Sequence, residues 1–199
     1  MAEQLVSRDK PRLLLHACCA PCSSSVVERL SADYAITILF YNPNIHPRSE
    51  HDKRRDELIR WGKQVRVPVL VEAYAADDWF AAVAGFEQEP ERGERCTICY
   101  RLRLQRCAER ARAEGFTWFT TVLSISPHKD AERINRLGSE IAAASGCSFY
   151  CANFKKQGGF QRSLELSRQY GFYRQNYCGC TFSRRESERR RQQRSAGRT

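Results

Sequence analysis

Short apolar runs alternate with longer amphipathic stretches along most of this chain, and this alternation restricts its fold more than any other feature. Apolar runs separated by amphipathic stretches are typical of strand–helix–strand units, in which successive strands pair in parallel. The sequence therefore predicts a mostly parallel sheet. The expected strands are Leu13 to His16, Ile36 to Tyr41, Val67 to Val71, Trp118 to Leu123 and Ser148 to Tyr150.

The stretches between these runs predict helices on the faces of the sheet. A chain of 199 residues with 42% hydrophobic residues is large enough to bury one core without disulfide cross-links. We therefore expect a single α/β domain over residues 1–183, with a mostly parallel, Rossmann-like sheet flanked by helices, and a basic, flexible C-terminal tail over residues 184–199. The expected helices are Ser23 to Leu30, Ser49 to Val65, Ile98 to Glu114, Ala131 to Ala144 and Gln161 to Tyr170.

The formal net charge is +10, and the tail supplies half of it, since residues 184–199 hold seven Arg and two Glu. A basic surface with a basic tail suits a polyanionic partner, of which nucleic acid is the commonest, and such binding is sensitive to salt. A solvated, disordered end would explain the same charge without a partner. Both interpretations of the tail stay open on charge alone.

Seven of the ten cysteines lie in three short groups. No N-terminal stretch resembles a signal peptide, and no apolar run approaches the roughly 20 residues that span a bilayer, so we expect a cytoplasmic protein with no membrane partner. In that reducing compartment, grouped cysteines indicate metal binding or redox catalysis before structural disulfides. The groups are HACCAPC with Cys18, Cys19 and Cys22, RCTIC with Cys96 and Cys99, and YCGC with Cys178 and Cys180.

The first two groups occupy places that favour ligand binding. Cys18 and Cys19 follow the first expected strand, and Pro21 suits the first turn of the next helix, whose positive end favours thiolates. Cys96 and Cys99 precede an expected helix in the same manner, and ligands of open α/β sheets bind beyond the strands' carboxyl ends. Four thiolates suit a 4Fe–4S cluster or a structural zinc, and spacing alone does not separate them. Adjacent ligands are unusual for a zinc knuckle, which favours iron–sulfur.

The third group is different in kind. A disulfide between Cys178 and Cys180 closes a tight ring that needs a flexible centre, which Gly179 provides. A strained, exposed disulfide is easily reduced, so the pair indicates a redox-active dithiol, although two unrelated thiols or two further metal ligands remain alternatives. Core packing is the expected role of the other three cysteines, Cys107, Cys147 and Cys151.

Six motifs in order along the chain resemble the QueH family of epoxyqueuosine reductases. They are LLLHACCAPCSSSVVERL, FYNPNIHPRSEH, ERCTICYRLRL, FTTVLSISPHK, FKKQGGFQRSLELS and YRQNYCGC. The resemblance implies a cytoplasmic enzyme of tRNA modification. Such an enzyme removes the epoxide oxygen of epoxyqueuosine and leaves queuosine at the wobble base, the last step of queuosine biosynthesis.

The resemblance also implies a cofactor. The family carries a 4Fe–4S cluster and a redox-active disulfide, and the sequence does not identify the electron donor. One departure concerns Cys22, where many relatives carry Asp. Either residue can bind an additional iron ion, so Cys22 is a candidate accessory iron ligand or a neighbouring thiol. On the matching motifs the cluster ligands are Cys18, Cys19, Cys96 and Cys99, and the disulfide joins Cys178 to Cys180.

Removing an epoxide oxygen requires two electrons and a source of protons. His16, beside the first cysteine group, is a candidate proton donor, with a satisfied histidine at a strand end as the alternative. Lysines after two expected strands are expected to contact tRNA phosphate or the sugar-like cyclopentane portion of the substrate, although lone lysines are usually solvated. Arginines at the start of the tail are expected to contact tRNA. These residues are Lys129, Lys155, Lys156, Arg184 and Arg185.

Two other classes of protein fit part of the pattern. Cys19-Ala-Pro-Cys22 after a strand has the form of a thioredoxin-like CxxC motif, which would indicate a general thiol–disulfide oxidoreductase. That interpretation leaves Cys18 and the RCTIC group unexplained. A non-enzymatic zinc module that binds RNA would use the four cysteines of the first two groups. Metal and sulfide content would separate these classes from an iron–sulfur reductase.

Overall fold

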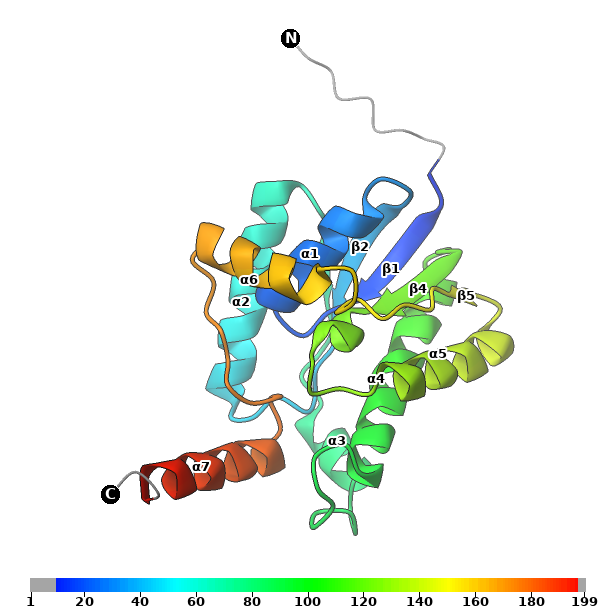
Figure 1. Ribbon diagram of the computed structural model, residues 1–199. Helices are drawn as coiled ribbons and strands as arrows, with labels where there is room; N and C mark the ends of the chain where they lie inside the picture. Colours follow the sequence, from blue (N-terminus) through cyan, green and yellow to red (C-terminus); the bar gives the residue numbers. More distant parts are fainter. Residues whose placement is uncertain (1–9, 197–199) are drawn as a thin grey trace.

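Five parallel strands form the sheet of this protein, in the order β3-β2-β1-β4-β5 (Figure 1). The computed structural model describes residues 10–196, so residues 197–199 of the expected tail lie outside the described part. All five expected strands are present, and the prediction of a single α/β domain with a Rossmann-like sheet is confirmed. The strands are β1 (Arg12–His16), β2 (Ala35–Phe40), β3 (Val69–Val71), β4 (Trp118–Thr121) and β5 (Ser148–Phe149).

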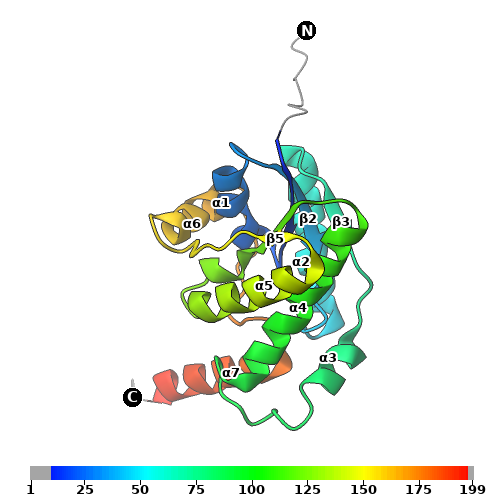
Figure 2. The same cartoon turned by 90° about the vertical axis from the view of Figure 1, so that its right-hand side faces the viewer.

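Helices cover both faces of the sheet, as Figures 1 and 2 show from two directions. The side chains of β1 explain why: Leu13 and Leu15 belong to the core on one face and Leu14 to the core on the other, because neighbouring strand residues point to opposite sides. Both faces are therefore apolar and both need a helix layer. The first face carries α1 (Ala20–Leu30) and α2 (Arg48–Val65), with α6 (Gly159–Gln169) against α1, and the second carries α4 (Glu94–Ala113) and α5 (Ala131–Ser145).

The structure differs from the sequence expectation in the RCTIC segment, which does not precede a helix but lies inside the first turns of α4. The helix begins at Glu94 because Gly93 occupies the N-cap position and the carboxylate of Glu89 accepts a hydrogen bond from the Glu94 amide at 3.1 Å. This cap satisfies one of the amide groups that a helix start leaves unpaired. Cys96 and Cys99 are therefore one helical turn apart on α4.

Three further elements were not expected from the sequence. The fourth expected strand stops early, because the Thr121 side chain accepts a hydrogen bond from the Leu123 amide at 3.2 Å and turns Val122–Ile125 into the short 3-10 helix η1. The helix α3 (Ala76–Ala82) lies in the connection from β3 to α4. The helix α7 (Thr181–Ala196) occupies the described part of the expected tail.

Helix α7 lies beside the start of α4 at the lower edge of the molecule in Figure 1. Two ion pairs join the elements, Arg95 to Glu186 and Arg190 to Glu91, each at 3.3 Å. The Arg95 guanidinium also stacks over the Phe182 ring at 4.6 Å. Within the described residues, no helix combines the length and the apolar character that crossing a membrane requires.

The order of the strands determines where a ligand can bind. From β1 the chain moves outward to β2 and β3 on one side, and later to β4 and β5 on the other. The connections that leave the carboxyl ends of β1 and β4 therefore diverge, which opens a crevice at this switch point. Cys18 follows β1, and Lys129 follows β4 and η1. The two segments meet at this crevice.

Candidate active site

Three thiols form a tight group where β1 passes into α1. The side chains of Cys18, Cys19 and Cys22 are close because Cys19 is the N-cap of α1 and Pro21 fills its first turn, which brings Cys22 back toward the strand end. Their sulfur atoms all lie within 4.8 Å of one another, and the Cys18 and Cys19 sulfurs are 3.8 Å apart. The group has three members, whereas a thioredoxin-like CxxC motif has two.

Hydrogen bonds within this group make Cys18 the thiolate. The pKa of Cys18 is well below its ordinary value because Cys19 and then Cys22 donate hydrogen bonds to its sulfur. The same contacts raise the pKa of Cys19 to about 12 and raise that of Cys22, since each of these thiols keeps its proton to share it. Ionised sulfur is the form that binds metal and acts as a nucleophile.

The CGC segment forms a turn at the end of a long return connection. Cys178 and Cys180 are both free thiols in this structure. The pKa of Cys178 is well below its ordinary value, first because Cys180 donates a hydrogen bond to it and then because of the nearby Lys129 ammonium, while the pKa of Cys180 is raised. Gly179 has a φ of +128°, a conformation that favours glycine. This segment therefore offers a second thiolate.

Buried groups from α2 and the loop before it hold this turn in place. The Arg54 guanidinium donates a hydrogen bond to the Cys178 carbonyl at 3.2 Å, and the His46 amide donates to the Gly179 carbonyl at 2.8 Å. Arg54 is itself paired with Glu50 at 2.6 Å. These contacts fix the backbone on both sides of Gly179, so the position of the Cys178 sulfur is set by the surrounding structure.

The two cysteines of α4 lie near the CGC turn. Cys99 packs in one apolar cluster with Cys178, Cys180 and Trp79. Burial raises the pKa of Cys96 to about 11 and raises that of Cys99, with the Cys178 thiolate adding to both shifts. The α4 pair and the CGC pair are therefore neighbours, although neither belongs to the three-thiol group.

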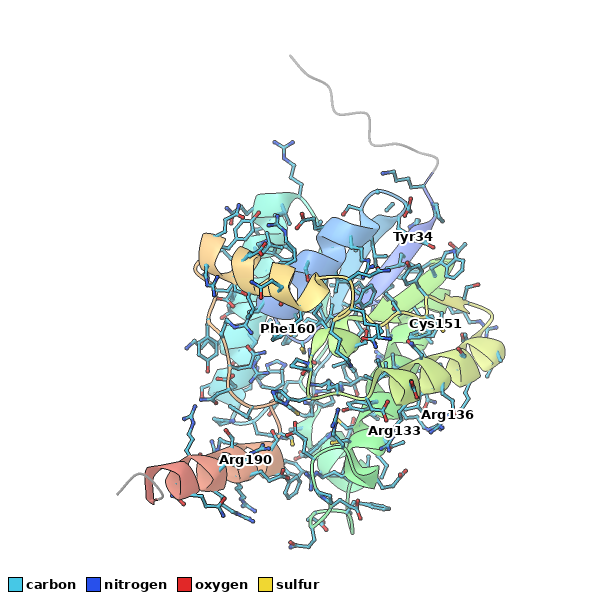
Figure 3. All side chains as sticks on the ribbon, in the orientation of Figure 1. Tyr34, Arg133, Arg136, Cys151, Phe160 and Arg190 are labelled. Atoms are coloured by element: carbon cyan, nitrogen blue, oxygen red, sulfur yellow. The ribbon has the colours of Figure 1, made fainter. Side chains whose placement is uncertain are left out.

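A cavity of about 430 Å³ lies between the first and the third cysteine groups, and neither Cys96 nor Cys99 is part of its wall. Cys18 and Cys22 lie in its wall with Cys178, so the first and third cysteine groups open into the same space. Figure 3 labels Phe160 of α6 and Arg190 of α7, which line the cavity from opposite sides. The polar residues of the wall include Ser126, His128, Lys129, Arg174, Gln175 and Asn176.

The residues expected to contact tRNA occupy three different environments. Lys129 is only 8% exposed and lines the cavity, so it can meet a group inside the cavity but not a phosphate at the outer surface. Lys155 is partly buried and donates a hydrogen bond to the Lys129 carbonyl at 3.1 Å. Lys156 is exposed, as are Arg184 and Arg185 on α7. Of these five residues, the last three present their side chains to solvent, where an RNA backbone could reach them.

His16 is fully buried at the end of β1. Its Nδ1 lies 2.8 Å from the Thr121 hydroxyl and its Nε2 lies 3.1 Å from the Tyr41 carbonyl. A carbonyl only accepts, so Nε2 carries the proton and Nδ1 accepts from Thr121. Burial, and then Arg103, lower the pKa of His16 to about 4. Both ring nitrogens therefore have hydrogen-bond partners within the protein, which does not favour His16 as the proton donor.

The three cysteines outside the groups differ in burial, which the sequence did not predict. Cys107 and Cys147 are buried in the core on the α4 face, as expected. Cys151 is exposed, with its sulfur 3.3 Å from the Ser139 hydroxyl, so the expectation of core packing for this residue is wrong. Strand β5 ends at Phe149, two residues earlier, and Cys151 lies in the connection that follows.

Two residues of the site, Arg54 and Gln175, were not found by sequence reasoning. Arg54 and Arg103 are almost fully buried, and the pKa of each is raised by nearby cysteines, and for Arg54 also by Glu50, against the opposing effect of burial. Gln175 donates a hydrogen bond to the Cys19 sulfur at 3.0 Å. The sequence showed only that Arg54 follows the FYNPNIHPRSEH motif, that Arg103 lies beside the CTIC motif and that Gln175 lies in the YRQNYCGC motif. None of those signals shows burial.

Comparisons with known proteins find relatives of this chain over most of its length. The family model described as "Epoxyqueuosine reductase QueH" matches residues 13–186, which include all seven grouped cysteines. A protein of that name from Haemophilus influenzae is 44% identical over 184 residues, covering 92% of this chain and 75% of the relative. Relatives from Acinetobacter baylyi and Thermotoga maritima are 44% and 36% identical, covering 89% and 86% of this chain and 83% and 89% of their own lengths.

Proposed function

The chain belongs to the QueH family of epoxyqueuosine reductases, and on that premise we propose that its cavity is the place where epoxyqueuosine in tRNA is reduced to queuosine. The observation that carries this proposal is the shared wall: Cys18 and Cys22 from the first group and Cys178 from the third open into one space of about 430 Å³. Cavities of roughly 300 to 1,000 Å³ accept ligands the size of one nucleoside.

The thiols of the site suit a metal cofactor. Three sulfur donors lie within 4.8 Å of one another, they are largely shielded from water, and one of them is held as a thiolate. Sulfur ligands of this kind select iron–sulfur clusters, zinc or other soft metals. The donor set therefore fits a resident metal group, and its chemistry fits iron–sulfur.

We assign Cys18, Cys19, Cys96 and Cys99 as ligands of a 4Fe–4S cluster. The supporting observation is electrostatic. The buried cation of Arg103 has its pKa raised by Cys99, Cys178 and Cys18 together, against the opposing effect of burial, so one cation interacts electrostatically with thiols of all three groups. Cys22, which lies with Cys18 and Cys19 and faces the cavity, would be the ligand of an additional iron ion.

When bound, an iron–sulfur cluster supplies electrons one at a time, and epoxide reduction needs two. Cys178 and Cys180 form a dithiol that can give up two electrons by closing a disulfide, and the low pKa of Cys178 prepares it as the attacking thiolate. The residues at the rim of the cavity, among them Arg174 and Asn176, would orient the modified nucleoside. An external donor must restore the electrons.

Binding of tRNA is assigned to the basic face that adjoins the cavity. Lys156, Arg184 and Arg185 are exposed, and Arg190 lies at the edge of the cavity on α7. No aromatic residue occurs among residues 184–199, so these arginines would attract the phosphate backbone rather than stack on bases. Lys155 would support this face through the loop that it holds at Lys129.

The test uses protein purified without oxygen, tRNA that contains epoxyqueuosine, and a strong reductant. After digestion, mass spectrometry measures the modified nucleoside. The expected result is loss of one oxygen atom by the wild type and by Cys151→Ala, and no loss by Cys18→Ala or Cys178→Ala. An unchanged nucleoside with wild type and a full complement of iron and sulfide would reject the reaction.

Metal analysis of the same samples tests the cofactor. A 4Fe–4S cluster holds equal amounts of iron and sulfide, and both should be lost together in Cys96→Ala and Cys99→Ala. Wild type should hold one iron in excess of sulfide, because of the additional ion at Cys22. Stoichiometric zinc without sulfide would instead support a zinc module that binds RNA. The additional iron is expected to disappear in Cys22→Ala while the cluster stays. Unaltered iron content and turnover in Cys22→Ala would remove the second metal site from the proposal.

A further inference from the structure

Lys129 is a buried cation with no carboxylate partner among the residues that the structure describes. The residue is only 8% exposed, and it lines the cavity whose wall also holds Cys18 and Cys178. Lysine is almost never buried without a partner, because removing an ammonium group from water is costly. A buried ammonium in a ligand-sized cavity therefore indicates a polar group of the ligand that completes its surroundings.

The backbone of the Ser126–Lys129 turn holds this side chain in place. The Lys129 amide donates to the Ser126 carbonyl at 3.2 Å, and the Lys129 carbonyl accepts from the Lys155 ammonium at 3.1 Å. The next residue, Asp130, is the N-cap of α5 and accepts hydrogen bonds from the Glu132 and Arg133 amides. Lys129 is thus fixed between a closed turn and a capped helix.

The sheet explains why this lysine meets the cysteines. Strands β1 and β4 are parallel neighbours, with His16 of β1 level with Thr121 of β4. Cys18 follows the first of these residues by two positions, and Lys129 follows the second after η1 and the turn. Both therefore emerge at the switch point of the sheet, where ligands of this fold class bind.

The charge of Lys129 is maintained by its neighbours. Burial alone would lower its pKa, but the Cys178 thiolate, then Tyr100 and the Cys18 thiolate, outweigh that effect and hold the pKa above its ordinary value. Arg103 is the nearby group that opposes them. The wall of the cavity therefore holds an ammonium group together with the sulfur atoms of Cys18 and Cys178. Such an arrangement favours reductive cleavage of a polar bond, because the sulfur side supplies electrons and the cation stabilises the atom that leaves as an anion.

We propose that the Lys129 ammonium group hydrogen-bonds to the epoxide oxygen of the substrate and stabilises the negative charge that develops on this oxygen as its bonds to carbon break. The inference rests on the proposed function and deepens it, because it names the group that receives the leaving oxygen. A preorganised donor in a cavity shielded from water is an effective way to stabilise such charge.

The reaction balances with Lys129 as a donor that is not consumed. Both carbon–oxygen bonds of the epoxide break, a carbon–carbon double bond forms, and the oxygen leaves as water. The two electrons come from the reductase's own thiol or iron–sulfur reductant, which an external electron donor restores, and two protons come from solvent through the cavity mouth. Lys129 keeps its charge throughout.

A phosphate is a poorer match for this position. Lys129 lies inside the cavity, whereas the exposed arginines of α7 are available to the RNA backbone at its edge. A phosphate group that reached Lys129 would also approach the thiolates of Cys18 and Cys178, and like charges repel. An epoxide oxygen is small and uncharged until the reaction begins, so it can approach both the ammonium and the sulfurs.

The experiment compares Lys129→Met, which removes the charge at nearly constant length, with Lys129→Arg, which keeps it. Lys63→Met, at an exposed position of α2, is the matched control. Each protein is reduced without oxygen and mixed in excess with tRNA that contains epoxyqueuosine, and the rate of queuosine formation is measured in a single turnover. Iron, sulfide, visible absorption and tRNA affinity are measured on the same samples.

We expect Lys129→Met to slow the single turnover by about 100-fold, as loss of one preorganised donor does elsewhere. Lys129→Arg should recover part of the rate, Lys63→Met should match wild type, and iron, sulfide and tRNA affinity should stay unchanged.

A Lys129→Met rate equal to wild type would overturn the inference while leaving the proposed function intact. If Lys129→Met lost iron to the same extent as rate, the inference would also be overturned, because Lys129 would then only balance the negative charge of the thiols. No queuosine from wild type would reject the proposed function itself.

Discussion

The side-chain amide of Gln175 donates a hydrogen bond to the sulfur of Cys19 at 3.0 Å, although the two residues are 156 positions apart in the chain. The return connection that carries the CGC turn therefore also contacts the first cysteine group. The other amide atom, Oε1, is buried without a hydrogen-bond partner among the described residues. Gln175 thus links the return connection that carries the CGC turn to the first cysteine group.

Replacing Gln175 with Leu should weaken metal binding at the first cysteine group. The hydrogen bond orients the Cys19 sulfur, and residues that orient a metal ligand commonly change metal affinity by about 10-fold or more. The rate at which a chelator removes iron, followed by absorbance without oxygen, measures the effect. Gln169→Leu, at an exposed position on α6, should release iron at the wild-type rate. Equal rates in both variants would show that Gln175 does not support the metal.

Replacing Gly179 with Ala should destabilise the fold. The residue has a φ of +128°, and an added Cβ would lie 2.9 Å from the Ile45 side chain and 3.4 Å from the Arg54 guanidinium. Conformational strain and steric overlap together should lower the free energy of unfolding by about 3 kcal/mol.

The control variant Gly85→Ala isolates the conformational strain, because the φ of Gly85 is +85° and nothing lies within 4 Å of its added Cβ. Its expected cost is about 1 kcal/mol, and urea unfolding measures both. Equal costs would mean that the surrounding side chains move aside and that the steric overlap adds no cost.

His46 should make stability fall in mild acid. Burial, and then the neighbouring His51, lower its pKa to about 4, whereas a histidine in the unfolded chain titrates near 6.5. The unfolded state therefore binds the proton first as the pH falls. The contribution of His46 is complete above pH 6.5 and is lost progressively toward pH 4.

The measurement is urea unfolding of wild type and His46→Gln at about pH 7.5 and about pH 5. The difference between wild type and variant should shrink by about 1 kcal/mol at the lower pH, allowing for partial exposure of the ring. Comparing the two proteins at each pH cancels the titrating groups that do not interact with His46. A difference that stays constant between the two pH values would contradict the lowered pKa.

The exposed arginines at the start of α7 should govern how tRNA binding depends on salt. In Arg184→Gln/Arg185→Gln, the slope of log affinity against log salt should become shallower by about one for each phosphate that the protein no longer neutralises. Turnover at saturating tRNA should stay unchanged, because neither side chain lines the cavity. Arg136→Gln is the control, since Figure 3 shows Arg136 on α5, away from α7. An unchanged slope in the double variant would remove these residues from the RNA-binding face.

Local sequence was sufficient to predict the strands and most helices. The alternation of side chains in Leu13–Leu15 and the helical spacing after each strand are properties of short segments, and they hold whatever surrounds them. The same is true of the three-thiol group, since the turn from β1 into α1 brings Cys18, Cys19 and Cys22 together by itself. The helix α3 was missed because its seven residues are too few to show a clear period.

What the tertiary structure alone decided is which distant side chains share the cavity and which charges are buried. Lys129 and Lys156 are both lysines after an expected strand, yet one is enclosed beside the cysteines and the other is exposed. Two long-range features make this difference. Strand β1 pairs with β4, and the chain returns so that Gln175 contacts Cys19. Those contacts depend on the free energy of packing the whole domain, and no short segment of sequence contains that information.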